Sequence, residues 1–363
     1  MRFNKILNSF PEYNPSSAKL SNDLIDLSKN ENPFDVSYEI KQIFYNKINQ
    51  TSLNRYPELT SDSIRQRISE FLNTYFKSYY LNLDKNNIVV GNGSDELISY
   101  LVKIFDGEEV IVSPPTFEMY EFYSKLHNLN VKKIPLDENY EINNLDQKIN
   151  EKTRIVFICS PNNPTGNIQP EEEIIKVLEK GFPVVIDEAY ADFSKKSMIK
   201  CLEKYPNLII LRTFSKAFGL AGIRAGILIA NQEIVRQIMK IKSPYSFNIL
   251  SEKMVETIIE NYEDVLKTID YIIEERNTLS EKLKGYALKS DSNFLLIDLS
   301  KISGLSAEDA YNFFLENKII VRKYTDILEN KIRVTVGTKE ENKKFLDCFN
   351  SLLDKYYWIK KSA

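Results

Sequence analysis

Histidine and cysteine are scarce in this sequence, and their scarcity argues against several kinds of site. The 363 residues include one histidine, His127, and three cysteines, Cys159, Cys201 and Cys348, which are widely separated and show no metal-ligand spacing. We therefore expect neither a bound metal nor a catalytic triad built on histidine. We interpret His127 as a surface or packing residue of a helix expected at 117–128.

Long apolar runs and an excess of one charge are also lacking. No stretch approaches the ~18 apolar residues needed to span a bilayer, and the N-terminal residues lack the continuous apolar centre of a secretory signal. The net charge of −3 gives no electrostatic reason to expect nucleic-acid binding. We therefore expect a cytoplasmic protein whose partners are small molecules, with neither a nucleic acid nor a membrane among them.

Strands and helices alternate along most of the chain. With 43% hydrophobic and 27% charged residues, the composition is that of a folded protein with two or more domains. Strands are expected at 87–90, 109–112, 154–159, 183–187, 208–211 and 225–229, and helices at 36–47, 61–75, 94–105, 117–128 and 170–180. This alternation predicts an α/β fold with three layers around an open, mainly parallel sheet.

A smaller α+β unit is expected after this sheet. The pattern predicts a long, kinked helix at 251–283, a helix at 307–317, and strands at 293–298, 319–322 and 331–336. Before the sheet, prolines in the first ~35 residues break any regular element and indicate an arm. We therefore divide the chain into an N-terminal arm that joins the small domain (1–35), a large domain (36–250) and a small C-terminal domain (251–363).

A lysine and an aspartate each follow a buried strand. Asp187 ends the apolar run at 184–186, and Lys216, 29 residues later, follows the run at 208–211. That separation matches one strand-helix-strand crossover, which would bring both side chains to one edge of a parallel sheet. Pyridoxal phosphate chemistry needs this pair, an amine that forms a Schiff base and a carboxylate that holds the ring nitrogen protonated. Each residue also has an ordinary interpretation, because a loop lysine is usually solvated and a strand-ending aspartate can cap the next helix.

A turn between a strand and a helix, at 91–97, suits the phosphate of such a cofactor. Its glycines let the backbone approach a ligand, and the N–H groups at the start of a helix bind phosphate. The acid Asp95 is what an ordinary helix start prefers, and only the backbone need face the anion. Arg224 can supply the countercharge, with hydroxyls from Thr213 and Ser215.

Two polar residues could contact the phenolate oxygen of the cofactor ring. Tyr190 follows Asp187 closely, and Asn163 lies in the turn at 160–166, which follows a strand. Both side chains carry a neutral hydrogen-bond donor. As a turn alone, 160–166 is ordinary, because its residues are common turn formers.

Taken together, these segments resemble the fold-type I pyridoxal-phosphate enzymes of the class I/II aminotransferase family. Within that family the sequence is most similar to the histidinol-phosphate aminotransferases. The matching segments run almost from end to end, at 27–33, 55–57, 91–97, 115–120, 162–166, 187–190, 213–224 and 333–338. The resemblance implies the cofactor pyridoxal 5′-phosphate and a homodimer as the working unit.

The resemblance also implies a cofactor site. Lys216 would be the Schiff-base lysine and would shuttle the proton between the substrate Cα and the cofactor, assisted by Asp187 and Tyr190. Phe117 would stack on the pyridine ring, and Tyr56 would reach the cofactor phosphate of the neighbouring subunit. The full expected set is Tyr56, Gly93, Ser94, Asp95, Phe117, Asn163, Asp187, Tyr190, Thr213, Ser215, Lys216 and Arg224.

Three residues are implied in substrate binding. Arg333 is similar to the arginine that grips the α-carboxylate of the amino donor, a task that suits a planar guanidinium. Arg322 and Tyr13 match family positions that approach the substrate phosphate, although the arm around Tyr13 departs from the usual sequence pattern of the family. Arg322 could equally pair with a surface acid at a sheet edge.

The implied reaction converts histidinol phosphate and 2-oxoglutarate to imidazole acetol phosphate and glutamate, in histidine biosynthesis. An aromatic or broad-range aminotransferase and a decarboxylase of a phosphorylated amino acid stay open, because sequence does not show which bond of the substrate is aligned for cleavage. A cofactor-binding regulator without turnover is disfavoured, because enzyme-like motifs begin so early that no room is left for a DNA-binding module.

Overall fold

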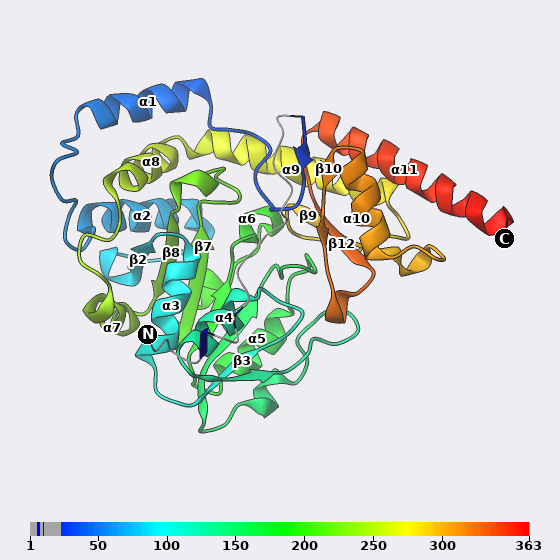
Figure 1. Cartoon of the computed structure of the whole chain (residues 1–363). Helices are drawn as coiled ribbons and strands as arrows, with labels where there is room; N and C mark the ends of the chain where they lie inside the picture. The colour runs from blue at the N-terminus through cyan, green and yellow to red at the C-terminus, as the bar shows by residue number, and fades with distance from the viewer. Residues whose placement is uncertain (1–5, 8–9, 11–22, 363) are drawn as a thin grey trace, which may run out of the picture.

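A seven-stranded sheet organises the larger part of the chain in the computed structural model, which describes residues 6–7, 10 and 23–362 (Figure 1). The strands are β2 (Ile88–Gly91), β3 (Glu109–Val112), β4 (Asn130–Lys133), β5 (Thr153–Cys159), β6 (Val184–Asp187), β7 (Leu208–Thr213) and β8 (Gly226–Ala230). Their order is β2-β8-β7-β6-β5-β3-β4. Every pairing from β4 to β7 is parallel, whereas β8 is antiparallel to both of its neighbours. The predicted α/β fold with a mainly parallel sheet is thus confirmed.

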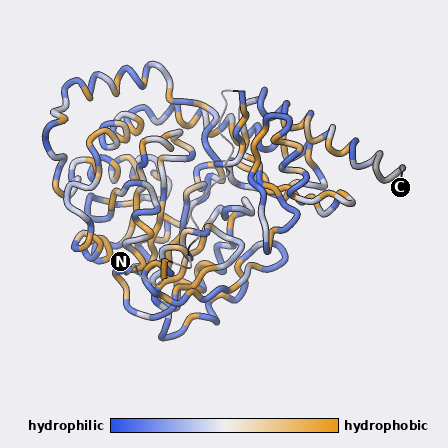
Figure 2. The backbone as a smooth tube through the Cα atoms, viewed as in Figure 1, coloured by the Kyte–Doolittle hydropathy of each residue, from blue (hydrophilic) through white to orange (hydrophobic). Residues whose placement is uncertain are grey.

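Helices cover both faces of this sheet. One face packs against α2 (Asp62–Tyr75), α5 (Glu171–Leu178) and α8 (Ile249–Glu260), and the other against α3 (Ser94–Ile104), α4 (Met119–Leu126) and α7 (Gln232–Ile241). Successive residues of a strand point to opposite faces of the sheet. Because helices cover both faces, the residues on each face are apolar and the strands are continuous apolar runs. Figure 2 shows these runs in orange along the central strands.

The smaller unit contains a three-stranded antiparallel sheet in the order β11-β12-β9. Its strands are β9 (Phe294–Asp298), β11 (Arg322–Lys323) and β12 (Lys331–Thr335), and its helices are α10 (Ala307–Glu316) and α11 (Lys339–Ser362). The sequence predicts no element for α7, α11 or β4. The domain limits expected at 35/36 and 250/251 stay predictions.

Three expectations from the sequence need correction. The helix expected at 251–283 is two helices, α8 and α9 (Tyr262–Lys282), because the backbone of Asn261 leaves the helical region. The strand expected at 319–322 is divided, since β10 (Ile319–Ile320) pairs with the arm and β11 pairs with β12. The arm therefore does contain a regular element, β1 (Ile25–Asp26), which is parallel to β10.

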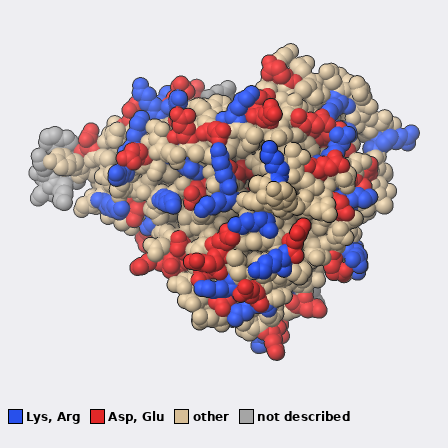
Figure 3. Space-filling model, turned by 180° about the vertical axis from the view of Figure 1, so that it is seen from behind, with Lys and Arg blue, Asp and Glu red and all other residues tan. Residues whose placement is uncertain are grey.

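The two remaining α-helices of the described chain differ in burial, since the first is largely exposed and the second is buried. Helix α1 (Tyr38–Asn49) begins at Ser37, whose side chain caps it, and α6 (Ala191–Ser194) is one turn after β6. Over the part of the chain that the structure describes, every helix is too short or too polar to cross a bilayer. On the face shown in Figure 3, basic and acidic side chains are interspersed.

Candidate active site

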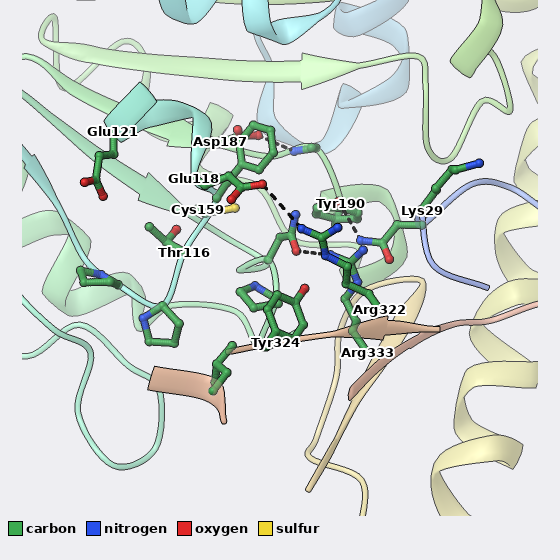
Figure 4. Close-up of a pocket in the computed structure, with 18 of the residues that line it drawn as sticks. Lys29, Thr116, Glu118, Glu121, Cys159, Asp187, Tyr190, Arg322, Tyr324 and Arg333 are labelled. Atoms are coloured by element: carbon green, nitrogen blue, oxygen red, sulfur yellow. Dashed lines mark hydrogen bonds and ion pairs between the residues drawn. The ribbon is translucent and has the colours of Figure 1, made fainter. Parts of the chain in front are cut away.

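A cavity of about 640 Å³ lies where the carboxyl ends of β5, β6 and β7 face the small sheet. In open α/β sheets this end of the strands is where ligands bind. Most of the residues predicted for the site line this cavity, namely Ser94, Asp95, Phe117, Asn163, Asp187, Tyr190, Thr213, Ser215, Lys216, Arg224, Arg322 and Arg333. The structure thus brings together side chains from distant segments (Figure 4).

Asp187 is the buried acid at the end of β6, where it is 3% exposed. One carboxylate oxygen, Oδ1, accepts from the backbone N–H of Ala189 at 3.0 Å, and Oδ2 accepts from the Tyr120 hydroxyl at 2.7 Å. Burial raises the pKa of this carboxyl to about 6, although both hydrogen bonds and the nearby Lys216 charge favour the anion. A buried carboxylate that lacks a full countercharge suits a cationic partner, such as a protonated ring nitrogen.

Lys216 follows β7 and is the candidate nucleophile. Its Nζ donates to the backbone oxygen of Lys29 at 3.0 Å and lies 5.8 Å from the centre of the Tyr190 ring. Burial, and then the charges of Arg333 and Arg224, lower the pKa of this amine to about 8. Roughly a tenth of it is therefore uncharged at pH 7, against fewer than about one in a thousand for an ordinary lysine.

Arg333, on β12, connects the small sheet to the cavity. Its Nη1 donates to Asn163 Oδ1 and its Nη2 to the backbone oxygen of Ser28, both at 2.6 Å. The guanidinium lies 5.3 Å from the centre of the Phe294 ring, and its Nε has no hydrogen-bond partner among the described residues. Because Asn163 accepts through its oxygen, the amide NH₂ of that residue is left as the donor.

Tyr190 is held by a residue to which the sequence assigned no role. Asn30 donates from its amide nitrogen to the Tyr190 hydroxyl at 3.0 Å, and the Tyr190 ring meets Phe294 edge to face. Asn30 itself has a φ of 55°, a left-handed conformation that asparagine tolerates better than most residues. The segment 27–33 matched the family, but only the folded chain shows that it contacts Tyr190.

The start of α3 forms a cradle beside Arg224. A Cβ added to Gly93 would lie 2.5 Å from Arg224 Nη2, and one added to Gly226 would lie 2.5 Å from the backbone carbon of Gly93. Both glycines therefore permit close approach of the helix start, β8 and the guanidinium. Gly93 precedes the lining residue Ser94 and also has a φ of 83°.

The groups around this cradle fit a phosphate. The buried hydroxyl of Ser215 has no hydrogen-bond partner among the described residues, and free backbone N–H groups at a helix start bind anions. Thr213 Oγ1 accepts from the backbone N–H of Ser215 at 3.1 Å, and both residues line the cavity. Among the described residues, the acid that pairs with Arg224 Nη2 is Asp95, whose Oδ2 lies 3.7 Å away.

Sequence and structure comparisons place this site in a family. Residues 22–349 match the family described as "Aminotransferase class I and II". The chain is 44% identical to the histidinol-phosphate aminotransferase of Thermococcus gammatolerans, covering 94% of this chain and 95% of the relative. It is 43% identical to that of Pyrococcus furiosus, covering 98% of each. The chain belongs to the class I and II aminotransferases.

Solved structures show the same fold. The histidinol-phosphate aminotransferase of Clostridium acetobutylicum superimposes with a TM-score of 0.80 at 27% identity, covering 92% of this chain and 100% of that one. That of Sinorhizobium meliloti, determined in complex with pyridoxal-5′-phosphate, gives a TM-score of 0.83 at 19% identity, covering 98% of each. Both likenesses extend over the large and the small sheet of this aminotransferase.

The cofactor of this aminotransferase is pyridoxal 5′-phosphate, and the cavity fits it. Its aldehyde and its electron-withdrawing ring supply the means to accept an amino group. Lys216 would hold the aldehyde carbon, Asp187 the ring nitrogen, and the cradle with Ser215 and Arg224 the phosphate. Phe117 lines the same cavity and would cover the ring.

One predicted residue lies elsewhere. Tyr56 is 83% exposed, stacks on Tyr245 and is not among the residues that line the cavity of its own chain. Tyr13 lies outside the described residues. Conversely, the sequence assigned no role to Tyr120, whose bond to Asp187 joins residues that are 67 positions apart.

Replacing Asp187 by asparagine should separate stability from cofactor binding in this aminotransferase. Because the native pKa of about 6 lies above the ordinary 3.8, the cofactor-free protein loses stability as pH rises through that window. We expect Asp187→Asn to melt higher than the parent at pH 8 without cofactor, with the gap narrowing towards pH 5. Its affinity for pyridoxal phosphate should fall by about tenfold or more, the equivalent of one pKa unit.

Thermal unfolding at several pH values and cofactor titration measure the two effects. The Tyr120 hydroxyl can turn to accept from the new amide, so the variant keeps a hydrogen bond at this place. A variant that is less stable at pH 8 and binds the cofactor as tightly as the parent would contradict the assignment of Asp187.

Proposed function

We propose that this aminotransferase converts histidinol phosphate and 2-oxoglutarate to imidazole acetol phosphate and glutamate, as a step of histidine biosynthesis. The names of the relatives at 44% and 43% identity support this substrate pair. Action in the cytoplasm, expected from the sequence, is part of the same proposal. The observation in the structure that supports it most is the pairing of two arginines in the cavity.

Arg322 and Arg333 are direct cross-strand partners of β11 and β12. Partners in an antiparallel pair place their side chains on the same face, and like charges in that position repel each other. Both residues line the cavity. The arrangement therefore favours ligands that bring two anionic groups, or one group of double charge, to this wall.

The two arginines differ in how firmly they are held. Arg333 is 7% exposed and is fixed by Asn163 and Ser28. The Arg322 side chain is 35% exposed, and its nearest acid is Glu118, with Nη2 and Oε1 3.9 Å apart (Figure 4). The sequence left open a pairing of Arg322 with a surface acid at a sheet edge, but the acid beside it, Glu118, itself lines the cavity.

This difference suits the two substrates. A fixed guanidinium favours a carboxylate that always arrives in one geometry, as the α-carboxylate of glutamate does. A loosely paired one can accept either the phosphate of histidinol phosphate or the second carboxylate of glutamate. Lys216 would then move the proton of the substrate Cα, and the bound cofactor would supply the acceptor for the amino group that 2-oxoglutarate later takes up.

A single-turnover experiment tests the substrate. Protein loaded with pyridoxal phosphate and mixed with histidinol phosphate, without 2-oxoglutarate, should release about one imidazole acetol phosphate per active site. Adding 2-oxoglutarate should then give continuous turnover and an equal amount of glutamate. If an aromatic amino acid reacts and histidinol phosphate does not, the protein is an aromatic aminotransferase. If carbon dioxide is released from a phosphorylated amino acid instead, it is a decarboxylase.

Replacing Arg322 by alanine tests the role of the arginine pair. A charge-assisted hydrogen bond to a phosphate contributes about 1.5–3 kcal/mol, so kcat/KM for histidinol phosphate should fall by about 10- to 100-fold. The half-reaction with glutamate should lose less, because Arg333 still holds the α-carboxylate. Arg322→Lys, which keeps the charge without the planar fork, should recover part of the loss. An equal loss for both substrates would remove Arg322 from phosphate recognition.

We also propose a homodimer in which Tyr56 of one subunit completes the cavity of the other. Large apolar side chains are exposed around α1, α7 and α8, which lie on one side of the molecule (Figure 1). They are Tyr38, Ile43, Tyr45, Leu53, Tyr56, Leu59, Ile241, Tyr245 and Leu250. An apolar surface of this kind favours contact with a second protein surface, here a second copy.

Mixed dimers test the contribution of Tyr56. Tyr56→Phe should weaken cofactor binding, and Lys216→Ala should abolish turnover. In a dimer of one Tyr56→Phe and one Lys216→Ala subunit, one of the two cavities has both side chains intact. Co-expression with two affinity tags should therefore recover about half of the parental activity per dimer. If the mixed dimer is no more active than the homodimers of either variant, Tyr56 acts within its own subunit or not at all.

A further inference from the structure

Tyr120 lies beneath the wall of the cavity and is held from three directions. It is fully buried, and its ring stacks on Phe157 with centroids 4.8 Å apart and planes 11° apart. The ring of Phe117 meets it edge to face at 5.5 Å, and its backbone oxygen accepts from the Ser124 hydroxyl at 2.7 Å. Its hydroxyl, 2.7 Å from Asp187 Oδ2, therefore has one available position.

We propose that Tyr120 is a positioning residue that fixes the Asp187 carboxylate and keeps it ionised for the ring nitrogen of the cofactor. The inference rests on the cofactor and not on the identity of the substrate. Tyr120 lines no part of the cavity and is not expected to touch the cofactor, so its effect passes through Asp187.

The geometry leaves the carboxylate little freedom. Tyr120 donates to one oxygen, and the backbone N–H of Ala189 donates to the other at 3.0 Å. Rotation of the carboxylate would break both hydrogen bonds and would leave the fully buried Tyr120 hydroxyl without its acceptor. Each oxygen keeps a further lone pair, and Asp187 lines the cavity, so the carboxylate can still accept a proton donor from there.

The electrostatic surroundings make the hydroxyl important. Five titratable side chains of the described residues interact with Asp187 from the elements packed around it, namely Tyr120 on α4, Cys159 on β5, Asp95 on α3, Tyr190 after β6 and Lys216 after β7. Burial and Asp95 oppose the anion, whereas Tyr120 and Lys216 favour it. Burial raises the pKa of Tyr120 and Cys159 far above neutrality, so the phenol keeps its proton and remains a donor. Without the Tyr120 hydroxyl, the pKa of Asp187 would rise further, and the carboxylate would become protonated closer to neutral pH.

The same short segment also positions the other contact to the ring. Phe117 lies three residues before Tyr120, and the two rings touch. The turn that begins α4 thus carries the side chain expected to cover the ring and the side chain that orients its acid. A shift of this turn would affect both contacts together.

Cofactor titration of the cofactor-free protein tests the proposal. Tyr120→Phe should weaken the binding of pyridoxal phosphate by about tenfold at pH 7.5, the effect of one hydrogen bond to a charged group. As pH is lowered, the affinity for pyridoxal phosphate should fall when Asp187 becomes protonated, and in Tyr120→Phe this fall should occur at a higher pH than in the parent. Tyr75→Phe is the matched control, because Tyr75 donates to another aspartate, Asp192, at 2.9 Å and neither residue lines the cavity. It should bind the cofactor as the parent does.

A double-mutant cycle decides whether Tyr120 acts through Asp187. In an Asp187→Asn background, adding Tyr120→Phe should change cofactor affinity by less than about twofold. Equal losses in both backgrounds, or a Tyr120→Phe protein that behaves like Tyr75→Phe, would overturn the proposal. Failure of the parent to bind pyridoxal phosphate would instead contradict the cofactor assignment.

An isosteric change covers the case in which Tyr120→Phe does not fold. 3,5-Difluorotyrosine at position 120 keeps the shape of the ring and makes the hydroxyl a stronger donor. The pH at which cofactor affinity falls should then move downward, opposite to the effect of phenylalanine. A shift in the upward direction would show that the hydroxyl does not support the anion.

Discussion

The burial of one carboxylate, that of Asp187, is the constraint on which the site depends. Placing this acid at the end of a central strand costs stability, because neither of its two hydrogen bonds brings a positive charge. The fold tolerates that cost through Tyr120 and Ala189, and a cationic ring nitrogen would offset it. The buried charge of Asp187 destabilises the cofactor-free protein and would be compensated when the cofactor binds. Cofactor binding and folding stability are therefore linked.

The second constraint is that the cavity needs both sheets. Lys216 comes from the large sheet and donates to Lys29 in the arm, while Arg333 comes from the small sheet and donates to Ser28. Asn30, next along the arm, donates to Tyr190. Residues 28–30 thus contact groups from both units at the cavity, which explains why a segment expected to be an irregular arm carries one of the family's motifs.

Sequence reasoning predicted most of what depends on local pattern. The apolar runs gave the central strands, and the separation of Asp187 from Lys216 matched one crossover, since β6 and β7 are adjacent in the sheet. The bond between Tyr120 and Asp187 had no local signal, because it joins a helix to a strand 67 residues away. The division of 319–322 between two sheets could not be predicted from the sequence either. Val321 is apolar like the residues before it, and β10 and β11 differ only in the strands with which they pair. The role proposed for Tyr56 involves a second subunit, which one chain does not contain.

The positive charges of the cavity connect the fold to the choice of reaction. Six basic residues of the described chain line it: Lys29 and Lys323 pair with Asp26 and Glu308, whereas Lys216 and Arg224 come from the large unit and Arg322 and Arg333 from the small sheet. Lys216 and Arg224 face the cofactor side, where one phosphate would neutralise Arg224. Arg322 and Arg333 lie on neighbouring strands and are left for the substrate. Because the bond that breaks at the substrate Cα is the one that the pocket aligns across the ring, the two arginines would, in the proposed substrate-binding role, also influence whether a proton or a carboxylate leaves. On this proposal, substrate selectivity would depend on the small sheet, and the cofactor chemistry common to the family on the large one.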